Sequence, residues 1–264
     1  MESPPESGKR GETSAPLIAL HHVHKRFGGG VEALRDVSLE VRAAEFVALL
    51  GPSGCGKSTV LRLAAGLEAA SSGQVSVPAL DTSGTDGATA FVFQEPTLMP
   101  WASVFDNVWL PLRLAHRGRA DCAPLVRQVL ASVGLEEFEH AYPAQLSGGM
   151  KMRASIARAL VTQPRVLLMD EPFAALDDIT RQKLNGDLLR WWAEQRLAAL
   201  FVTHSVAEAV FLSQRVLVMS ARPGRIVAEV AIDEPYPRTP AFRSSSAFVE
   251  SCRRLGDALE RASA

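Results

Sequence analysis

One short segment constrains this chain of 264 residues more than any other feature. Residues 51–58, with the sequence GPSGCGKS, match the pattern G-x-x-x-x-G-K-[ST], in which backbone N–H groups of a glycine-rich turn surround phosphate oxygens. The apolar residues 45–50 before this segment predict a buried strand, and residues 58–67 after it predict a helix. Because a helix N-terminus favours anions, this order of strand, loop and helix predicts a site for a nucleoside triphosphate.

The residue types of the loop suit a triphosphate bound with a metal ion. Lys57 is expected to reach the β- and γ-phosphates, and the Ser58 hydroxyl is expected to hold Mg²⁺. Cys55 is expected to be a small filler, but the charge of Lys57 and the helix N-terminus also favour a lowered thiol pKa, in which case alkylation would block ATP binding. The alternative is a chance glycine-rich turn. The predicted ATP-binding residues of the loop are Gly51, Pro52, Ser53, Gly54, Cys55, Gly56, Lys57, Ser58 and Thr59.

A second segment, residues 166–171, is an apolar run that ends in two carboxylates, Asp170 and Glu171. Ligands bind at the carboxyl ends of the strands in parallel sheets, so this position suits a catalytic role. Asp170 is expected to support Mg²⁺ directly or through a water, and Glu171 to orient and deprotonate the attacking water. The alternative is a pair of solvated acids at the start of a loop.

A third segment, residues 146–150 with the sequence LSGGM, resembles the signature motif that defines ABC ATPases. As in that family, it lies between the phosphate-binding loop and the two carboxylates. The resemblance implies that Ser147, Gly148 and Gly149 contact the γ-phosphate of a nucleotide bound to a second subunit. The active unit is therefore expected to be two ATPase subunits facing head to tail, in a homodimer or with a close partner. Met150 stands where many relatives have Gln, but activity is expected to survive the loss of that amide.

Four further positions resemble functional positions of the same family. Phe27 resembles the aromatic residue that stacks on adenine, and Gln94 the glutamine that contacts Mg²⁺ and the attacking water. Asp177 belongs to a segment that resembles the loop crossing the dimer interface, and His204 resembles the switch histidine that bonds the γ-phosphate. Taken alone, Phe27 also fits a core residue at a strand end, and His204 an ordinary strand-end histidine. The predicted catalytic residues are Lys57, Gln94, Glu171 and His204, and the predicted Mg²⁺ site combines Ser58, Gln94 and Asp170.

The resemblance extends over about residues 17–230 and implies the fold class. This is an α/β P-loop NTPase (RecA-like) core with an antiparallel β-subdomain and an inserted α-helical subdomain. Residues 71–87 are rich in small residues and are interpreted as a loop. The predicted division is a disordered tail (1–16), an ABC ATPase domain (17–235) with its helical subdomain at about 95–160, and a helical C-terminal extension (236–264).

Composition excludes several classes of function. Lys plus Arg (28) nearly balances Asp plus Glu (29), so no basic excess points to nucleic acid as a partner. The three cysteines are far apart in sequence, which argues against a disulfide framework or a zinc site and suits a reducing cytosol. The apolar runs are much shorter than the roughly 20 residues of a membrane-spanning helix. A role at a membrane is therefore expected to need a separate permease.

Finer features resemble one branch of the family, the nitrate, sulfonate and taurine importers. They include residues 94–101 (QEPTLMPW) and residues 221–226 (ARPGRI). The resemblance implies an ATP-hydrolysing subunit at the cytoplasmic face of the inner membrane, which energises uptake of a small anionic or organic solute through permease subunits. An extracytoplasmic binding protein would take part indirectly. Part of 95–114 is expected to receive a permease helix, or else to be only core. Alternatives are another importer branch, an ABC ATPase acting on nucleic acid or ribosomes, and a regulatory module that does not hydrolyse ATP.

Overall fold

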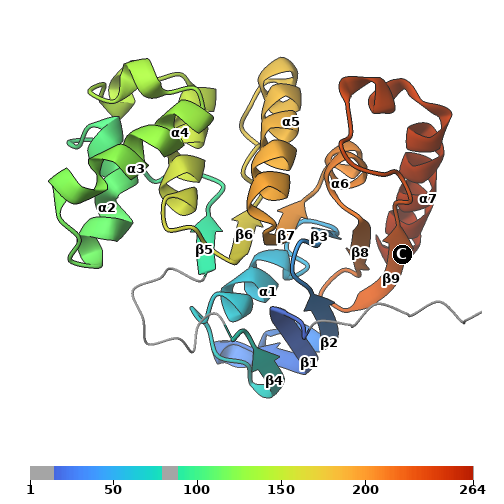
Figure 1. Ribbon diagram of the computed structural model, residues 1–264. Helices are drawn as coiled ribbons and strands as arrows, with labels where there is room; N and C mark the ends of the chain where they lie inside the picture. Colours follow the sequence, from blue (N-terminus) through green and yellow to red (C-terminus); the bar gives the residue numbers. More distant parts are fainter. Residues whose placement is uncertain (1–14, 79–88, 264) are drawn as a thin grey trace, which may run out of the picture.

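The computed structural model describes residues 15–78 and 89–263. Within these residues the chain forms two β-sheets and a group of helices at one end of the larger sheet, as Figure 1 shows. The tail expected at 1–16 lies outside the described residues, apart from its last two positions. In the described part of the chain, no helix combines the length and the hydropathy needed to span a bilayer.

The larger sheet positions the site. Its described strands, in order across the sheet, are β5 (Thr89–Val92), β6 (Val166–Asp170), β7 (Ala198–Thr203), β3 (Phe46–Leu50), β8 (Arg215–Met219) and β9 (Ile226–Ala231). The first five run parallel, and β9 pairs antiparallel with β8. The central strands β3 and β7 are buried along their whole length, as expected for parallel strands covered on both faces.

Parallel pairing aligns the carboxyl ends of three central strands. Leu50 at the end of β3 lies opposite Thr203 at the end of β7, and Asp170 at the end of β6 lies opposite Val202. The residues that follow these strands therefore meet at one edge of the sheet, which is where ligands bind in open α/β sheets.

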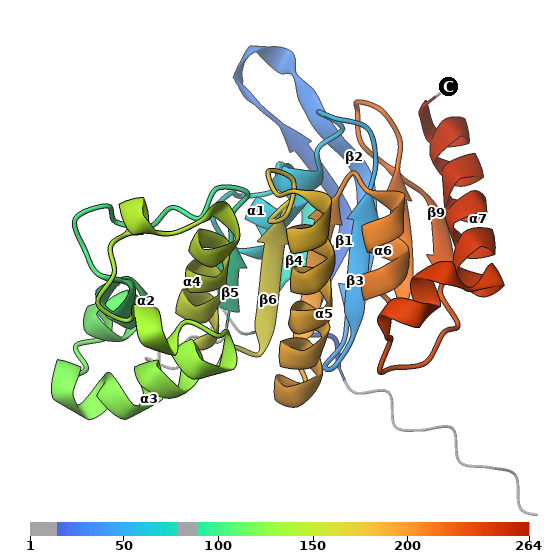
Figure 2. The ribbon, with the colours of Figure 1, turned by 90° about the horizontal axis from the view of Figure 1, so that it is seen from above.

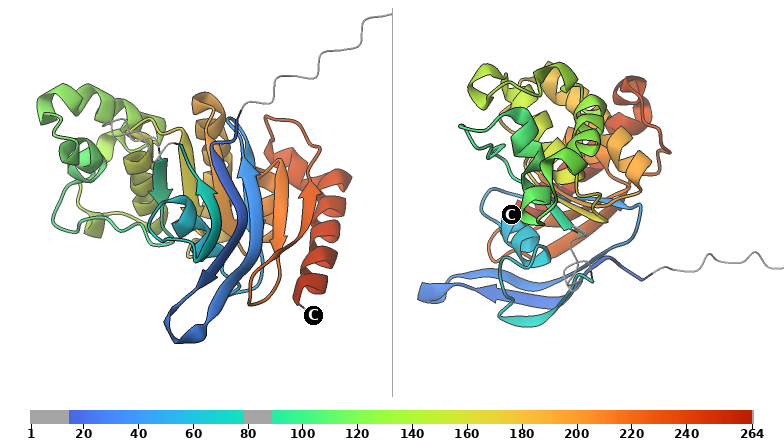
Figure 3. Two further views of the ribbon diagram at one scale, coloured as in Figure 1. Left: turned by 90° about the horizontal axis from the view of Figure 1, so that it is seen from below. Right: turned by 60° about the vertical axis from the view of Figure 1, so that its left-hand side comes forward.

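The smaller sheet is antiparallel. Its described strands are β2 (Glu32–Val41), β1 (Ile18–Arg26) and β4 (Ser72–Ser76), in that order. The loop expected at 71–87 is therefore wrong for Ser72–Ser76, and its positions 79–87 lie outside the described residues. Since β4 is an edge strand that is mostly exposed on both faces, its sequence SGQVS has no apolar alternation to reveal it. The turn between β1 and β2 projects beyond the larger sheet (Figures 2 and 3).

The stretch 95–160 contains no strand in the described structure. It holds α2 (Val104–Leu114), α3 (Arg119–Ser132) and α4 (Gly148–Leu160), with two short 3₁₀ turns, Glu136–Phe138 and Pro143–Gln145, between α3 and α4. These helices stand at the β5 end of the larger sheet, and α7 (Ser246–Ser263) covers the opposite end beside β8 and β9 (Figure 1).

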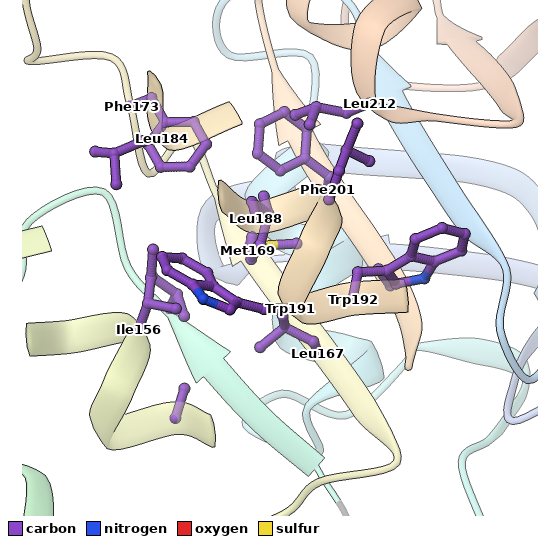
Figure 4. Packing of buried hydrophobic residues seen from close by; sticks show 14 of the residues in the cluster. Ile156, Leu167, Met169, Phe173, Leu184, Leu188, Trp191, Trp192, Phe201 and Leu212 are labelled. Atoms are coloured by element: carbon purple, nitrogen blue, oxygen red, sulfur yellow. The ribbon is translucent and has the colours of Figure 1, made fainter. Parts of the chain in front are cut away.

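The remaining helices cover the two faces of the larger sheet. One face packs on α1 (Lys57–Ala64), whose Val60 and Leu61 share a buried cluster with residues of both sheets. The other face packs on α5 (Asp178–Gln195) and α6 (Val206–Leu212), where Trp191 and Phe201 lie in a second cluster (Figure 4). The sequence did not predict α6, because seven residues are too few for helical periodicity to appear. The phosphate-binding loop leaves the buried strand β3 and leads directly into α1.

Candidate nucleotide-binding site

The loop that joins β3 to α1 has a shape that requires glycine at two positions. A Cβ on Gly51 would lie 2.9 Å from the Cys55 Sγ, and a Cβ on Gly56 would lie 2.6 Å from the Leu34 Cδ2. Gly56 also has a φ of +108°, a left-handed conformation that other residues rarely adopt. The glycine spacing of the motif therefore follows from close packing of the loop on its neighbours.

Lys57 places its ammonium inside the loop. Its Nζ donates hydrogen bonds to the carbonyl oxygens of Gly51, at 2.8 Å, and Pro52, at 3.0 Å. The side chain is 5% exposed, and Nζ lies 3.7 Å from a carboxylate oxygen of Glu171. Among the described residues, this buried cation contacts two carbonyls and one distant carboxylate, which favours an incoming anion.

Ser58 and Asp170, two of the three residues predicted for Mg²⁺, lie in contact. The Ser58 hydroxyl donates to the Asp170 Oδ1 at 2.9 Å. Burial raises the pKa of Asp170, while the hydrogen bond from Ser58 and the nearby cations act in the opposite direction. Carboxylate and hydroxyl oxygens fit Mg²⁺, which keeps few protein ligands and takes the rest of its shell from water and phosphates. No cluster of three or more His, Cys, Asp or Glu suited to a metal occurs in the described ranges.

Glu171 lies between two of the other predicted catalytic residues. Its Oε2 is 2.9 Å from the Nδ1 of His204, and its Oε1 is the oxygen that faces Lys57. Its φ of +45° turns the chain directly after β6, and its N–H donates to the carbonyl oxygen of Val202 at 3.0 Å. Such a left-handed conformation is uncommon for a residue other than glycine. The carboxylate is 22% exposed, so water can reach it.

A pocket of about 280 Å³ collects most of the predicted ATP-binding groups. Phe27 is 38% exposed at one side of it, with the Lys25 Nζ 4.9 Å from the ring centroid. This exposure disfavours the core alternative for Phe27 and leaves a ring face available for stacking. The lining residues are Phe27, Val31, Ala33, Ser53, Gly54, Gly56, Lys57, Ser58, Thr59, Glu171 and Arg222.

The signature and interface residues lie outside this pocket. Ser147 caps α4 and accepts a hydrogen bond from the Met150 N–H, while Asp177 caps α5 and accepts one from the Thr180 N–H. That bond at Thr180 is the main reason why the pKa of Asp177 is lowered. Ser147, Gly148 and Asp177 are exposed, and Gly149 packs tightly against Thr180. Gln94 is also exposed and does not line the pocket. The pocket of this chain is therefore lined by residues of the phosphate-binding loop and not by the signature segment.

Arg222 is a pocket residue that the sequence reasoning missed. Its Nε and Nη2 donate to the carbonyl oxygen of Gly54 at 3.1 and 3.0 Å. The same turn packs against the loop, since a Cβ on Gly224 would lie 2.0 Å from the Cys55 carbonyl oxygen. Residues 221–226 were noted only for their resemblance to one branch of the family, and nothing local in them indicates contact with a loop so distant in the chain.

The structure contradicts one of the two expectations for Cys55. It is 1% exposed, and burial raises the pKa of its thiol although the nearby charge of Lys57 acts in the opposite direction. The expectation of a lowered pKa is therefore wrong, because removal from water outweighs the neighbouring charge. The small-filler interpretation agrees with the close contact to Gly51.

The chain is similar to known proteins in sequence and in structure. A family model described as "ABC transporter" matches residues 34–174. A taurine import ATP-binding protein of Rhizobium johnstonii is 46% identical over 79% of this chain and 79% of its own. An aliphatic sulfonates import ATP-binding protein of Xanthomonas axonopodis pv. citri is 45% identical over 85% of this chain and 89% of its own. A solved dimer of a bacterial ABC transporter cassette has a TM-score of 0.70 and 31% identity, with 83% of this chain and 100% of that one covered.

This chain belongs to the ABC transporter family. The predicted fold class is thereby confirmed. Within the family it is an ATP-binding subunit that hydrolyses ATP.

Replacing Arg222 by Ala should weaken ATP binding with little effect on folding. The change removes two charge-assisted hydrogen bonds that hold the Gly54 carbonyl and takes a positive charge from the pocket. At about 1 kcal/mol for such an exposed contact, the Kd for ATP should rise about three- to tenfold. Equilibrium titration with a fluorescent ATP analogue measures this. Arg225→Ala, in the same turn but outside the pocket lining, is the control, and equal affinities for both variants would contradict the role of Arg222.

Thiol labelling should separate the three cysteines. Cys55 and Cys122 are buried and Cys252 is partly exposed, so a thiol reagent added to the folded protein should modify Cys252 first. Cys55 should react only when the protein unfolds, and ATP should therefore give it little further protection. Peptide mass mapping over time measures the order, and modification of Cys55 in the folded protein as fast as Cys252 would contradict its burial.

Proposed function

We propose that this subunit energises the import of a small anionic or organic solute, of the nitrate, sulfonate or taurine kind, through separate membrane permease subunits. The import ATP-binding relatives in taurine and sulfonate systems support the branch. The balanced charge of the chain gives no support to action on nucleic acid. The protein would work at the cytoplasmic face of the inner membrane, with an extracytoplasmic solute-binding protein as an indirect partner.

The observation that carries the hydrolytic part is the position of Glu171 between Lys57 and His204. Glu171 accepts a proton from a water whose oxygen attacks the γ-phosphorus, while the bond to the bridging oxygen breaks and ADP leaves. Lys57 stabilises the charge that grows on the phosphoryl oxygens. An ionised carboxylate only accepts hydrogen bonds, so the His204 Nδ1 donates to Glu171 and Nε2 stays available to a phosphate.

Mg²⁺ would be held by Ser58 and Asp170, with Gln94 as a further contact. Bound there with ATP, it would neutralise charge on the β- and γ-phosphates. The Gln94 side chain is exposed just after β5, so this role needs it to turn toward the pocket. Ser58 and Asp170 are already joined by their hydrogen bond, and we assign them the main part of the site.

The second half of the site would come from a second ATPase subunit, preferably another copy of this chain. Ser147, Gly148 and Asp177 are exposed at helix N-termini and lie outside the pocket of their own chain. Backbone N–H groups at the start of α4 suit a γ-phosphate that is brought by a partner. We therefore propose a head-to-tail dimer with two composite sites.

Contact with the permease is proposed for a groove between β5, α2 and α4. Its volume is about 350 Å³, and its lining includes Phe91, Leu110 and Leu114, the last of which is 71% exposed. Trp101, in the segment expected to receive a permease helix, is 76% exposed. Exposed large apolar side chains beside a groove are typical of docking surfaces.

Glu171→Gln should block hydrolysis and preserve ATP binding. The amide keeps the shape of the side chain but takes up no proton, so kcat should fall at least about 100-fold while the Kd for ATP changes less than about threefold. ATP should also make the variant dimerise, because the closed state is no longer emptied by hydrolysis. Phosphate release and size-exclusion chromatography with ATP measure both effects.

Glu194→Gln, an exposed position on α5, is the matched control and should keep the activity of the unmodified protein. Turnover by Glu171→Gln at the unmodified rate would rule out the base role of Glu171.

A further inference from the structure

A buried carboxylate lies behind the predicted switch histidine. Glu208, in α6, is 6% exposed, and its Oε2 accepts a hydrogen bond from the Thr203 hydroxyl at 2.5 Å. The Thr203 oxygen in turn accepts the N–H of Ser205 at 2.9 Å, and the Ser205 Oγ accepts the N–H of Glu208. The residues on both sides of His204 are therefore tied to Glu208, so the position of this carboxylate sets the position of the histidine.

The other oxygen of Glu208 is unsatisfied. Its Oε1 is buried and has no hydrogen-bond partner among the described residues, and the same holds for the Nε of Arg181. These two atoms are 3.9 Å apart, which is close enough for ionic attraction and too far for a hydrogen bond. A buried donor and a buried acceptor left unpaired are costly, so a state in which they meet is favoured.

The two terminal nitrogens of Arg181, Nη1 and Nη2, contact residues of the interface loop. Its Nη2 donates to the Leu176 carbonyl oxygen at 2.6 Å, and its Nη1 lies 3.2 Å from the Asp178 Oδ1. Asp177, the predicted interface residue, stands between these two contacts. The planar Arg181 guanidinium thus contacts the loop on both sides of Asp177, and its third nitrogen, Nε, faces Glu208.

We propose that Glu208 and Arg181 are positioning residues that couple the switch histidine His204 of one site to the interface loop around Asp177. A displacement of about 1 Å would close the gap between the Arg181 Nε and the Glu208 Oε1 to hydrogen-bond length. The inference rests on the proposed function, since it uses the roles proposed for His204 and Asp177. It goes further by assigning a route by which the γ-phosphate contact at one site affects the loop that faces the second subunit.

Burial and the surrounding cations shift the pKa of Glu208 in opposite directions. Burial raises the pKa of Glu208, whereas the Thr203 hydrogen bond and the charges of Arg181 and Arg243 lower it. Arg243 comes from the 3₁₀ turn before α7 and lies over the Phe211 ring, 3.8 Å from its centroid. Removing one partner of such a pair leaves a buried charge uncompensated.

A double-mutant cycle on ATP hydrolysis tests the coupling. Glu208→Gln and Arg181→Met should each lower kcat about tenfold and bring the Hill coefficient for ATP toward 1, with KM changed less than about threefold. The double variant should be no slower than the slower single variant, because both changes interrupt the same contact. Arg190→Met, an exposed arginine on the same helix, is the control and should keep both kcat and the Hill coefficient.

A conservative variant keeps the test decisive if Glu208→Gln or Arg181→Met unfolds the protein. Arg181→Lys keeps the charge, but a single ammonium does not span both Leu176 and Glu208, so it should fold with an unchanged melting temperature and still lose cooperativity. Independent, multiplicative effects in the cycle, or full cooperativity in Arg181→Lys, would overturn the coupling. The variant His204→Ala distinguishes failure of the proposed function from failure of the coupling. Full turnover in this variant would refute the role proposed for His204. Loss of turnover in this variant, together with additive effects in the double-mutant cycle, would refute the coupling alone.

Discussion

The parallel register of three strands is the constraint on which the site depends. Because β3, β7 and β6 pair in parallel with their carboxyl ends aligned, the residues that follow them arrive at one edge. The phosphate-binding loop follows β3, His204 follows β7, and Glu171 follows β6. A register shift of one residue would turn these side chains to the other face of the sheet and separate them. The buried packing on both faces fixes that register.

The turn after β8 packs against the phosphate-binding loop and supports it. Gly224 lies under the Cys55 carbonyl, its N–H donates to the Ala33 carbonyl oxygen, and the Arg35 N–H donates to the carbonyl oxygen of Gly224. The smaller sheet and the larger sheet therefore hold the loop from two sides. Such support lets a loop with three glycines keep a single shape, which lowers the ordering cost of binding a phosphate.

Local sequence signals predicted the phosphate-binding loop and the strand that ends in two carboxylates, and the family resemblance implied the fold class. Two motifs can be recognised from a short stretch of sequence: the glycine spacing of 51–58, and the apolar run that ends in Asp170 and Glu171. Other features depend on contacts between distant parts of the chain. The bond from Arg222 to Gly54 and the pair of Arg181 and Glu208 join elements far apart in sequence, so no local pattern indicates them. The thiol pKa of Cys55 was expected to be lowered, and this was wrong. Burial, which cannot be read from the sequence, raises the pKa and outweighs the charge of Lys57.

Mixing two inactive variants tests most directly whether the working site is composite. Lys57→Ala removes the phosphate-loop cation and Ser147→Arg blocks the signature motif, so each variant alone should lack ATPase activity in both of its sites. In a mixed head-to-tail dimer, the unaltered loop of one subunit meets the unaltered signature motif of the other. Mixing should therefore restore a substantial part of the turnover, and ATPase activity that stays at the level of the separate variants in mixed dimers would contradict a site shared between two subunits.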